Sequence, residues 1–150
     1  PGEFPYGYLG RWAGADYDDE AGKPRYKWPG GFPKQRFLFG INEALDGTDG
    51  QPIVVTEGVF GALHCVQCGF PATVAAFGAS LSREQAKLLI STGRPVVLMF
   101  DGGQPGRRAM KKAALRLAPH TFVRIVRLNE HQQPDDLPPE EVRRILSRTV

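Results

Sequence analysis

The stretch that decides the fold runs from residue 95 to residue 103 and reads Pro95-Val96-Val97-Leu98-Met99-Phe100-Asp101-Gly102-Gly103. An apolar run of this kind, without polar alternation, is typical of a strand buried on both faces of a parallel sheet. The acidic residue and the two glycines come where such a strand ends and the backbone turns. The stretch therefore predicts a central strand with a polar site at its carboxyl end.

The pattern of strand followed by helix repeats on both sides of this stretch. Short apolar, β-branched runs predict further strands at residues 53–56, 73–77 and 121–128. Helical segments are predicted at 60–68, from an N-cap at Ser82 to Gly93, at 106–117 and at 138–148. Because such crossovers are right-handed and place helices on both faces, the alternation predicts an α/β fold with a mostly parallel sheet.

The first 46 residues differ from the rest in composition. Glycine, proline and aromatic residues dominate them, and residues 6–12 and 36–41 predict two short strands around an irregular crossing at 22–33. We expect residues 1–46 to form a small basic subdomain that contains β structure, and residues 51–150 to form the main domain.

Length and composition narrow the class of protein. The chain has 150 residues and two cysteines, and no apolar stretch approaches the length of about 20 residues needed to cross a membrane. Two cysteines do not make a disulfide framework, so we expect the cytoplasm as location and no membrane partner. The chain starts at Pro1 without a Met or a signal peptide, which predicts a fragment of a longer protein.

Basic side chains gather in two segments that contain no acidic residue, 23–36 and 107–127, although the net charge is only +3. Such segments attract polyanions, among them DNA and RNA. A solvated helix face and an exposed hairpin have the same composition. Charge alone leaves both interpretations open.

Acidic residues follow three of the predicted strands. Glu57 comes after the strand at 53–56, Asp101 after the central strand, and Asp135 beyond the last one. Because parallel strands end at the same edge of a sheet, we expect these carboxylates to lie close together and to share a hard divalent cation. Taken singly, Glu57 and Asp101 would also serve as helix caps, so the hypothesis depends on all three together.

At this point the sequence resembles a known family. Four blocks carry the resemblance, with matching order and spacing: Val54-Val55-Thr56-Glu57-Gly58, Ala75-Ala76-Phe77-Gly78, Phe100-Asp101-Gly102 with Gly106-Arg107-x-Ala109, and Pro134-Asp135. They are similar to the Toprim domain of bacterial and phage replicative DNA primases. Upstream, Pro24-Arg25-Tyr26, Lys34 and residues 38–44 are similar to the basic subdomain that precedes Toprim in those primases.

The resemblance implies roles for the acidic residues. Glu57 matches the glutamate that acts in general acid/base catalysis or metal binding, and Asp101 and Asp135 match metal ligands. The implied cofactor is Mg²⁺, with Mn²⁺ as a substitute. The implied reaction is template-directed synthesis of an RNA primer on single-stranded DNA.

The basic residues would then contact nucleic acid or nucleotide. Arg25 and Lys34 match basic positions that face template or incoming nucleotide in the family, and Lys27, Arg107, Arg108 and Lys111 lie in the two acid-free segments. The implied partners are single-stranded DNA and nucleoside triphosphates. A helicase or a zinc-binding module would be supplied by the rest of a longer protein.

Three positions depart from the family pattern, since Gly61, Gly103 and Gln133 stand where primases usually have acids. Two hypotheses follow: an active primase-type nucleotidyltransferase, and a nucleic-acid-binding module of a replication, mobile-element or phage protein with weak or no catalysis. A Toprim nuclease is a third. Cys65 and Cys68 form a C-x-x-C pair, for which we favour a buried, structural role over zinc or redox chemistry.

Overall fold

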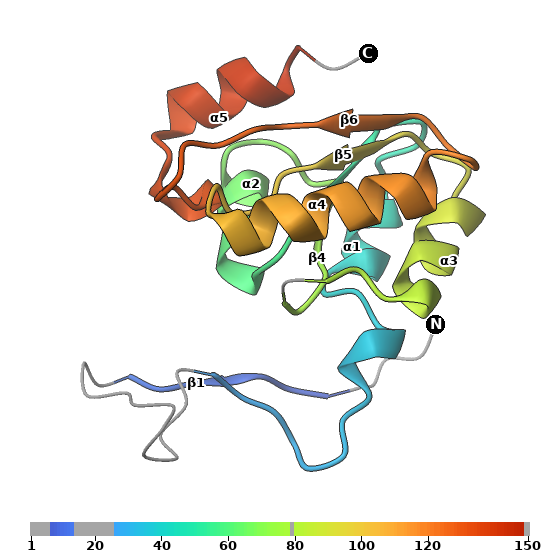
Figure 1. Cartoon of the computed structure of the whole chain (residues 1–150), viewed down its shortest axis with the longest axis vertical. Coiled ribbons are helices and arrows are strands. Elements are labelled where there is room, and N and C mark those ends of the chain that lie inside the picture. Colours follow the sequence, from blue (N-terminus) through green and yellow to red (C-terminus); the bar gives the residue numbers. More distant parts are fainter. Residues whose placement is uncertain (1–6, 14–25, 79, 149–150) are drawn as a thin grey trace. The chain divides into compact units, whose positions relative to one another are not determined.

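The computed structural model describes residues 7–13, 26–78 and 80–148 (Figure 1). The chain divides into two compact units, Pro1–Pro33 and Lys34–Val150, which are described separately. None of the described helices is long and apolar enough to cross a membrane.

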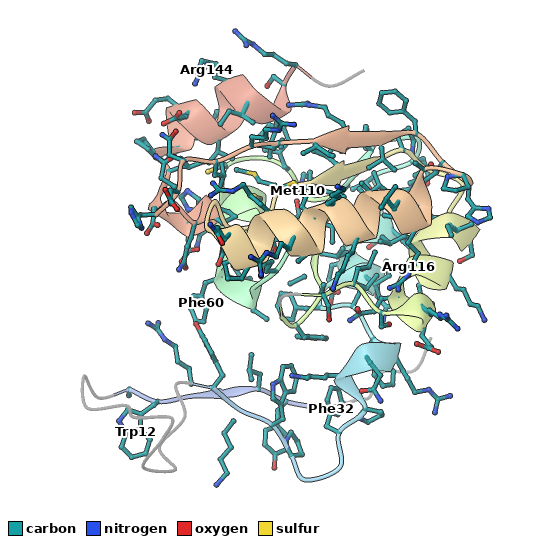
Figure 2. All side chains as sticks on the ribbon, in the orientation of Figure 1. Trp12, Phe32, Phe60, Met110, Arg116 and Arg144 are labelled. Carbon is teal, nitrogen blue, oxygen red and sulfur yellow. The ribbon has the colours of Figure 1, made fainter. Side chains whose placement is uncertain are left out.

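The first unit contains a two-stranded antiparallel sheet, in which β1 (Gly10–Arg11) pairs with β2 (Tyr26–Lys27). The ring of Trp28 stacks on that of Phe32, with centroids 5.2 Å apart (Phe32 is labelled in Figure 2). β1 lies inside the strand predicted at 6–12. The described part of the crossing predicted at 22–33 has little regular structure, since only the two residues of β2 form a ladder with β1 before the Pro-Gly-Gly turn begins.

The second unit opens with the short 3₁₀ helix η1 (Lys34–Arg36) and the helix α1 (Ile41–Leu45). The strand predicted at 36–41 is wrong. Phe39 forms only an isolated antiparallel bridge with Ala75, whose amide and carbonyl both bond to it. Gly40 then takes the left-handed conformation, with φ 73°, and turns the chain into α1 before a strand develops.

A four-stranded parallel sheet forms the centre of the second unit, in the order β4-β3-β5-β6 (Figure 1). Its strands are β3 (Ile53–Thr56), β4 (Thr73–Ala75), β5 (Val96–Leu98) and β6 (Val123–Ile125). The remaining elements are α2 (Val59–Gln67), α3 (Arg83–Ser91), α4 (Gln104–Leu117), the 3₁₀ helix η2 (Pro134–Asp136) and α5 (Pro139–Leu146). The predicted α/β fold is confirmed, with β3 at its predicted bounds and the other three strands shorter than the sequence suggested.

Alternate residues of the strands supply two separate hydrophobic layers. Ile53, Val55 and Leu98 pack with α1, α3 and α4 on one face of the sheet. Val54 and Val97 pack with α2 and α5 on the other face. The two layers explain why β3 and β5 are apolar at every position, since both of their faces are buried. They also fix the carboxyl ends of these neighbouring strands at one edge.

Candidate active site

Glu57 and Asp101 meet at the carboxyl edge of the sheet. Glu57 follows β3 directly, Asp101 lies just beyond β5, and these two strands are neighbours. The Glu57 side chain is buried, with the residue 8% exposed, and its Oε1 accepts a hydrogen bond from the Asp101 amide at 3.2 Å. Two acids that are 44 residues apart are therefore in direct contact.

Both carboxyls lie in an environment that disfavours their charged forms. Burial, and then the charge of Asp101, raise the pKa of Glu57 to about 7, although the hydrogen bond from the Asp101 amide opposes the rise. Burial also raises the pKa of Asp101, and the charges of Asp135 and Asp136 add to the effect. Within the described residues, neither Glu57 nor Asp101 has a basic side chain as ion-pair partner.

Asp135 reaches the same edge from η2. Asp135 is exposed, while Oδ2 of the neighbouring Asp136 accepts a hydrogen bond from the Gln133 amide at 2.8 Å. His64 on α2 donates from Nε2 to the Leu137 carbonyl at 2.8 Å and thereby ties the end of η2 to α2. Glu57 and Asp101 are thus in contact at this edge, and the charge of Asp135 acts on Asp101 from η2.

The glycines after β5 are required by close packing. A Cβ at Gly106 would lie 2.2 Å from the Asp101 carbonyl oxygen and 2.6 Å from Oε1 of Glu57. A Cβ at Gly102 would lie 1.7 Å from the Asn129 carbonyl oxygen. The first turn of α4 can therefore pass against the two acids only because residue 106 has no side chain.

The three neutral positions are used for packing and capping. A Cβ at Gly61 would already be 3.1 Å from the Cβ of Pro134, so the space where primases usually have an acid is filled by η2. At the start of η2, the Gln133 amide donates to Oδ2 of Asp136 at 2.8 Å, and the Gln133 carbonyl accepts from the Asp136 amide at 3.1 Å. Gly103 is the N-cap of α4, and the nearest neighbour of a Cβ there would be 3.5 Å away.

The donor set fits one cation better than two. No group of three or more His, Cys, Asp or Glu side chains in the described part of the chain is close enough to hold a metal ion. Mg²⁺, however, commonly binds proteins through one or two carboxylates and takes its other oxygens from water and substrate phosphates. Glu57 and Asp101 match that requirement, and a bound cation would offset the charge repulsion that raises their pKa values.

The cysteines do not belong to the site chemistry. Cys65 and Cys68 are buried in the layer beneath α2, as favoured from the sequence. Burial, and then the charges of Cys68 and Asp135, raise the pKa of the Cys65 thiol to about 12. A protonated thiol is neither a metal ligand nor a nucleophile.

The predicted basic residues fall into three groups. Arg107 donates to the Gly102 carbonyl and lies 3.6 Å from Glu130, so it braces the turn between β5 and α4. Arg108 contacts Gln104 at 3.2 Å, and Lys111 is exposed on the outer face of the same helix. Lys34 lies in η1 of the second unit, whereas Lys27 lies in β2 of the first. Arg25 lies outside the described residues.

One positioning residue, Gln85, was not predicted. Its buried Nε2 lies 3.2 Å, 2.8 Å and 2.8 Å from the carbonyl oxygens of Lys34, Phe37 and Ala76. Its Oε1 accepts from the Ser82 amide at 2.8 Å and completes a capping box. The Ser-x-x-Gln spacing predicts the box. The three carbonyls come from other elements and leave no local sequence pattern.

A second unpredicted feature is Phe77, which has the positive φ of 63° at the end of β4. A bulky residue in this region is strained and often lies near a functional site. The next residue, Gly78, donates its amide to the Glu57 carbonyl at 3.0 Å. The strained turn therefore fixes the backbone of the acid.

The fold and the site define a doubly wound α/β domain. Its parallel strands are covered by helices on both faces and carry carboxylates at the ends of adjacent strands, and ligands of such domains bind at the carboxyl edge of the sheet. The sequence model of the family described as Toprim-like matches residues 54–137. The chain belongs to this Toprim-like family, which confirms the resemblance inferred from its motifs.

The similar proteins are bacterial DNA primases. The DNA primase of Thermotoga maritima is 36% identical over 108 residues, which make up 71% of this chain and 19% of that relative. The solved zinc-binding and RNA polymerase domains of the Aquifex aeolicus primase match with a TM-score of 0.80 at 29% identity, over 97% of this chain and 37% of that one. A DnaG catalytic domain solved with single-stranded DNA matches with 0.76 at 26%, over 95% and 47%. The chain is thus a primase-like Toprim core that spans less than half of these proteins.

Proposed function

We propose that this chain catalyses RNA primer synthesis on a single-stranded DNA template. The observation that supports this most directly is the contact between Glu57 and Asp101, two desolvated acids without a basic partner in the described residues. Carboxylates held in this way suit Mg²⁺, or Mn²⁺ in its place. When bound, the ion would stabilise the negative charge that develops on the transferred phosphoryl group.

The chain's own residues have separate tasks in this proposal. Glu57 and Asp101, with Asp135, would hold the ion. Glu57 also matches the glutamate that acts in general acid/base catalysis in the primases, so we propose that it takes the proton of the attacking 3′-hydroxyl. The hydroxyl oxygen bonds to the α-phosphorus of a ribonucleoside triphosphate, and pyrophosphate leaves.

The basic residues would bind the polyanions. Lys34, Arg108 and Lys111 are exposed in the second unit, and Lys27 is exposed in the first. We propose that they contact template and nucleotide phosphates together with Arg25, while Arg107 shapes the turn that approaches them. Residues 1–46 would act as the basic subdomain and residues 51–150 as the Toprim domain. The cytoplasm is the proposed location, and a zinc-binding module or a helicase would be contributed from outside this chain.

A primer-synthesis assay tests the proposal. Residues 1–150 are incubated with single-stranded template, ribonucleoside triphosphates and Mg²⁺ or Mn²⁺, and we expect Glu57→Gln to lower synthesis by a factor of about 100 or more. Glu141→Gln is the matched control, because Glu141 lies on α5 and pairs with Arg144 across one helical turn, away from the two acids of the site. Equal activity of wild type and Glu57→Gln would refute the catalytic role.

The packing of η2 against Gly61 and the neutral side chain at Gln133 favour a second candidate function, a Toprim module that binds nucleic acid without catalysis. The same preparations distinguish the two. If wild type synthesises nothing but binds single-stranded DNA with a steep dependence on salt, the binding module is correct.

A further inference from the structure

A groove of about 690 Å³ lies between α4 and β6 in the second unit. Met110, Ala114 and Val123 form part of its apolar lining, and Figure 2 shows Met110 on the side of α4 turned toward the sheet. Two more of its aliphatic side chains face solvent, Leu115 with 69% and Ile125 with 43% of their surface exposed. Aliphatic side chains this exposed, on both walls of one groove, are typical of a docking surface.

One wall of the groove is the edge of the sheet. β6 is the last strand in the order β4-β3-β5-β6. Its bonds to β5 use the Phe122 carbonyl and the Val126 amide, and the backbone groups used alternate along a strand. The amides and carbonyls of Val123 and Ile125 therefore point away from β5, in the direction from which another strand could pair.

The charges that line the groove are all positive. Arg107, Lys111 and Arg127 contribute to the lining, and no acidic residue does. Lys111 and Arg127 form no ion pair within the described part of the chain. A segment that carries carboxylates would therefore complement the walls.

We propose that the groove binds an extended peptide segment, which adds to β6 as a fifth strand and presents both aliphatic and acidic side chains on the face turned toward α4. The aliphatic residues would cover Leu115 and Ile125, and an acidic residue on the same face of the peptide would meet Arg127. Six of the nine lining residues are apolar, which favours a peptide over nucleic acid, whose exposed groups are mainly charged or polar. Strand addition gives affinity through the backbone and specificity through alternate side chains.

A displayed library of short random peptides, selected on immobilised chain 1–150, tests the proposal. We expect the enriched peptides to carry aliphatic and acidic residues at every second position, so that these side chains share one face of the strand. Their affinity should fall at least tenfold for the double variant Leu115→Asp, Ile125→Asp, because it repels carboxylates and removes the apolar contacts. Leu63→Asp on α2, where Leu63 is 40% exposed, is the matched control and should bind like wild type. Thermal unfolding checks that all variants fold.

Hydrogen exchange distinguishes strand addition from other modes. Bound peptide should slow exchange of the Val123 and Ile125 amides. The proposal is overturned if the selected peptides bind the double variant as well as wild type, if these two amides stay unprotected, or if an oligothymidylate strand protects them instead. Because the double variant leaves Glu57 and Asp101 intact, loss of peptide binding and loss of primer synthesis are separate results.

Discussion

At the scale of single residues, the site depends on the carboxyl of Glu57, which is buried although a charged carboxylate is more stable in water. Glu57 is stabilised in its neutral form, since burial and the charge of Asp101 both raise its pKa, to about 7. Its Oε1 would still accept from the Asp101 amide if residue 57 were a glutamine, because the amide oxygen occupies the same position. The two side chains therefore differ mainly in charge.

This difference predicts a pH-dependent effect of Glu57→Gln on stability. In wild type, the contribution of Glu57 to the stability of the fold is fully present below pH 4.5, the ordinary pKa of the group. This contribution is lost as the pH rises through about 7, the pKa of Glu57 in the fold. We expect the variant to match wild type at pH 4.5 and to be more stable by about 2 kcal/mol at pH 8 without divalent cations. Urea unfolding at both values measures it, with Glu141→Gln as control. A difference that does not vary with pH would contradict the assignment.

Gly106 allows a second test at this scale. Gly106→Ala places a Cβ against the Asp101 carbonyl and Oε1 of Glu57, so α4 must shift or Glu57 must move. We expect a loss of about 3 kcal/mol in the free energy of unfolding, as for other overpacked sites. Gly58→Ala is the control, because a Cβ there would have no neighbour within 4 Å and φ is −105°. Equal urea midpoints for the two variants would contradict the close packing of Gly106 against Asp101 and Glu57.

At the scale of elements, the sequence predicted well the units with a strong apolar pattern and predicted poorly the short units without one. β3 and β5 are apolar on both faces, and α4 carries an inward stripe of Ala109, Met110, Ala113 and Leu117, so local pattern was sufficient for them. Residues 36–41 look like a strand, yet Phe39 has a single bridge, because Gly40 turns the chain. Short elements are decided by tertiary partners, which the local pattern does not contain.

Gln85 is such a tertiary partner, because its side chain holds η1 through hydrogen bonds to the carbonyls of Lys34 and Phe37. Gln85→Ala would leave the carbonyls of Phe37 and Ala76 without their side-chain donor and would remove half of the capping box on α3. We expect a loss of about 2 to 3 kcal/mol and faster hydrogen exchange at Phe37 than at β3. The exposed Gln67→Ala on α2 serves as control. If exchange at Phe37 does not change, Gln85 does not position Lys34.

At the scale of the whole molecule, the candidate site could be predicted because it follows from topology. The carboxyl ends of parallel strands share one edge, so Glu57 and Asp101 converge whatever the details of packing. The packing at Gly61 could not be predicted, because it depends on the contact of η2 with α2. The α4–β6 groove is likewise invisible in the sequence, since Leu115 and Ile125 belong to different elements.

The distribution of charge over the molecule supports a last prediction, about binding of single-stranded DNA. Lys111 is exposed on the outer face of α4 and has no acidic partner among the described residues, so a bound phosphate there would release counterions. Lys111→Ala should weaken binding similarly for all template sequences and reduce the slope of log affinity against log salt by about 0.7. Fluorescence anisotropy over a series of salt concentrations measures the slope, with Lys87→Ala on α3 as control. An unchanged slope for Lys111→Ala would place the nucleic acid elsewhere on the chain.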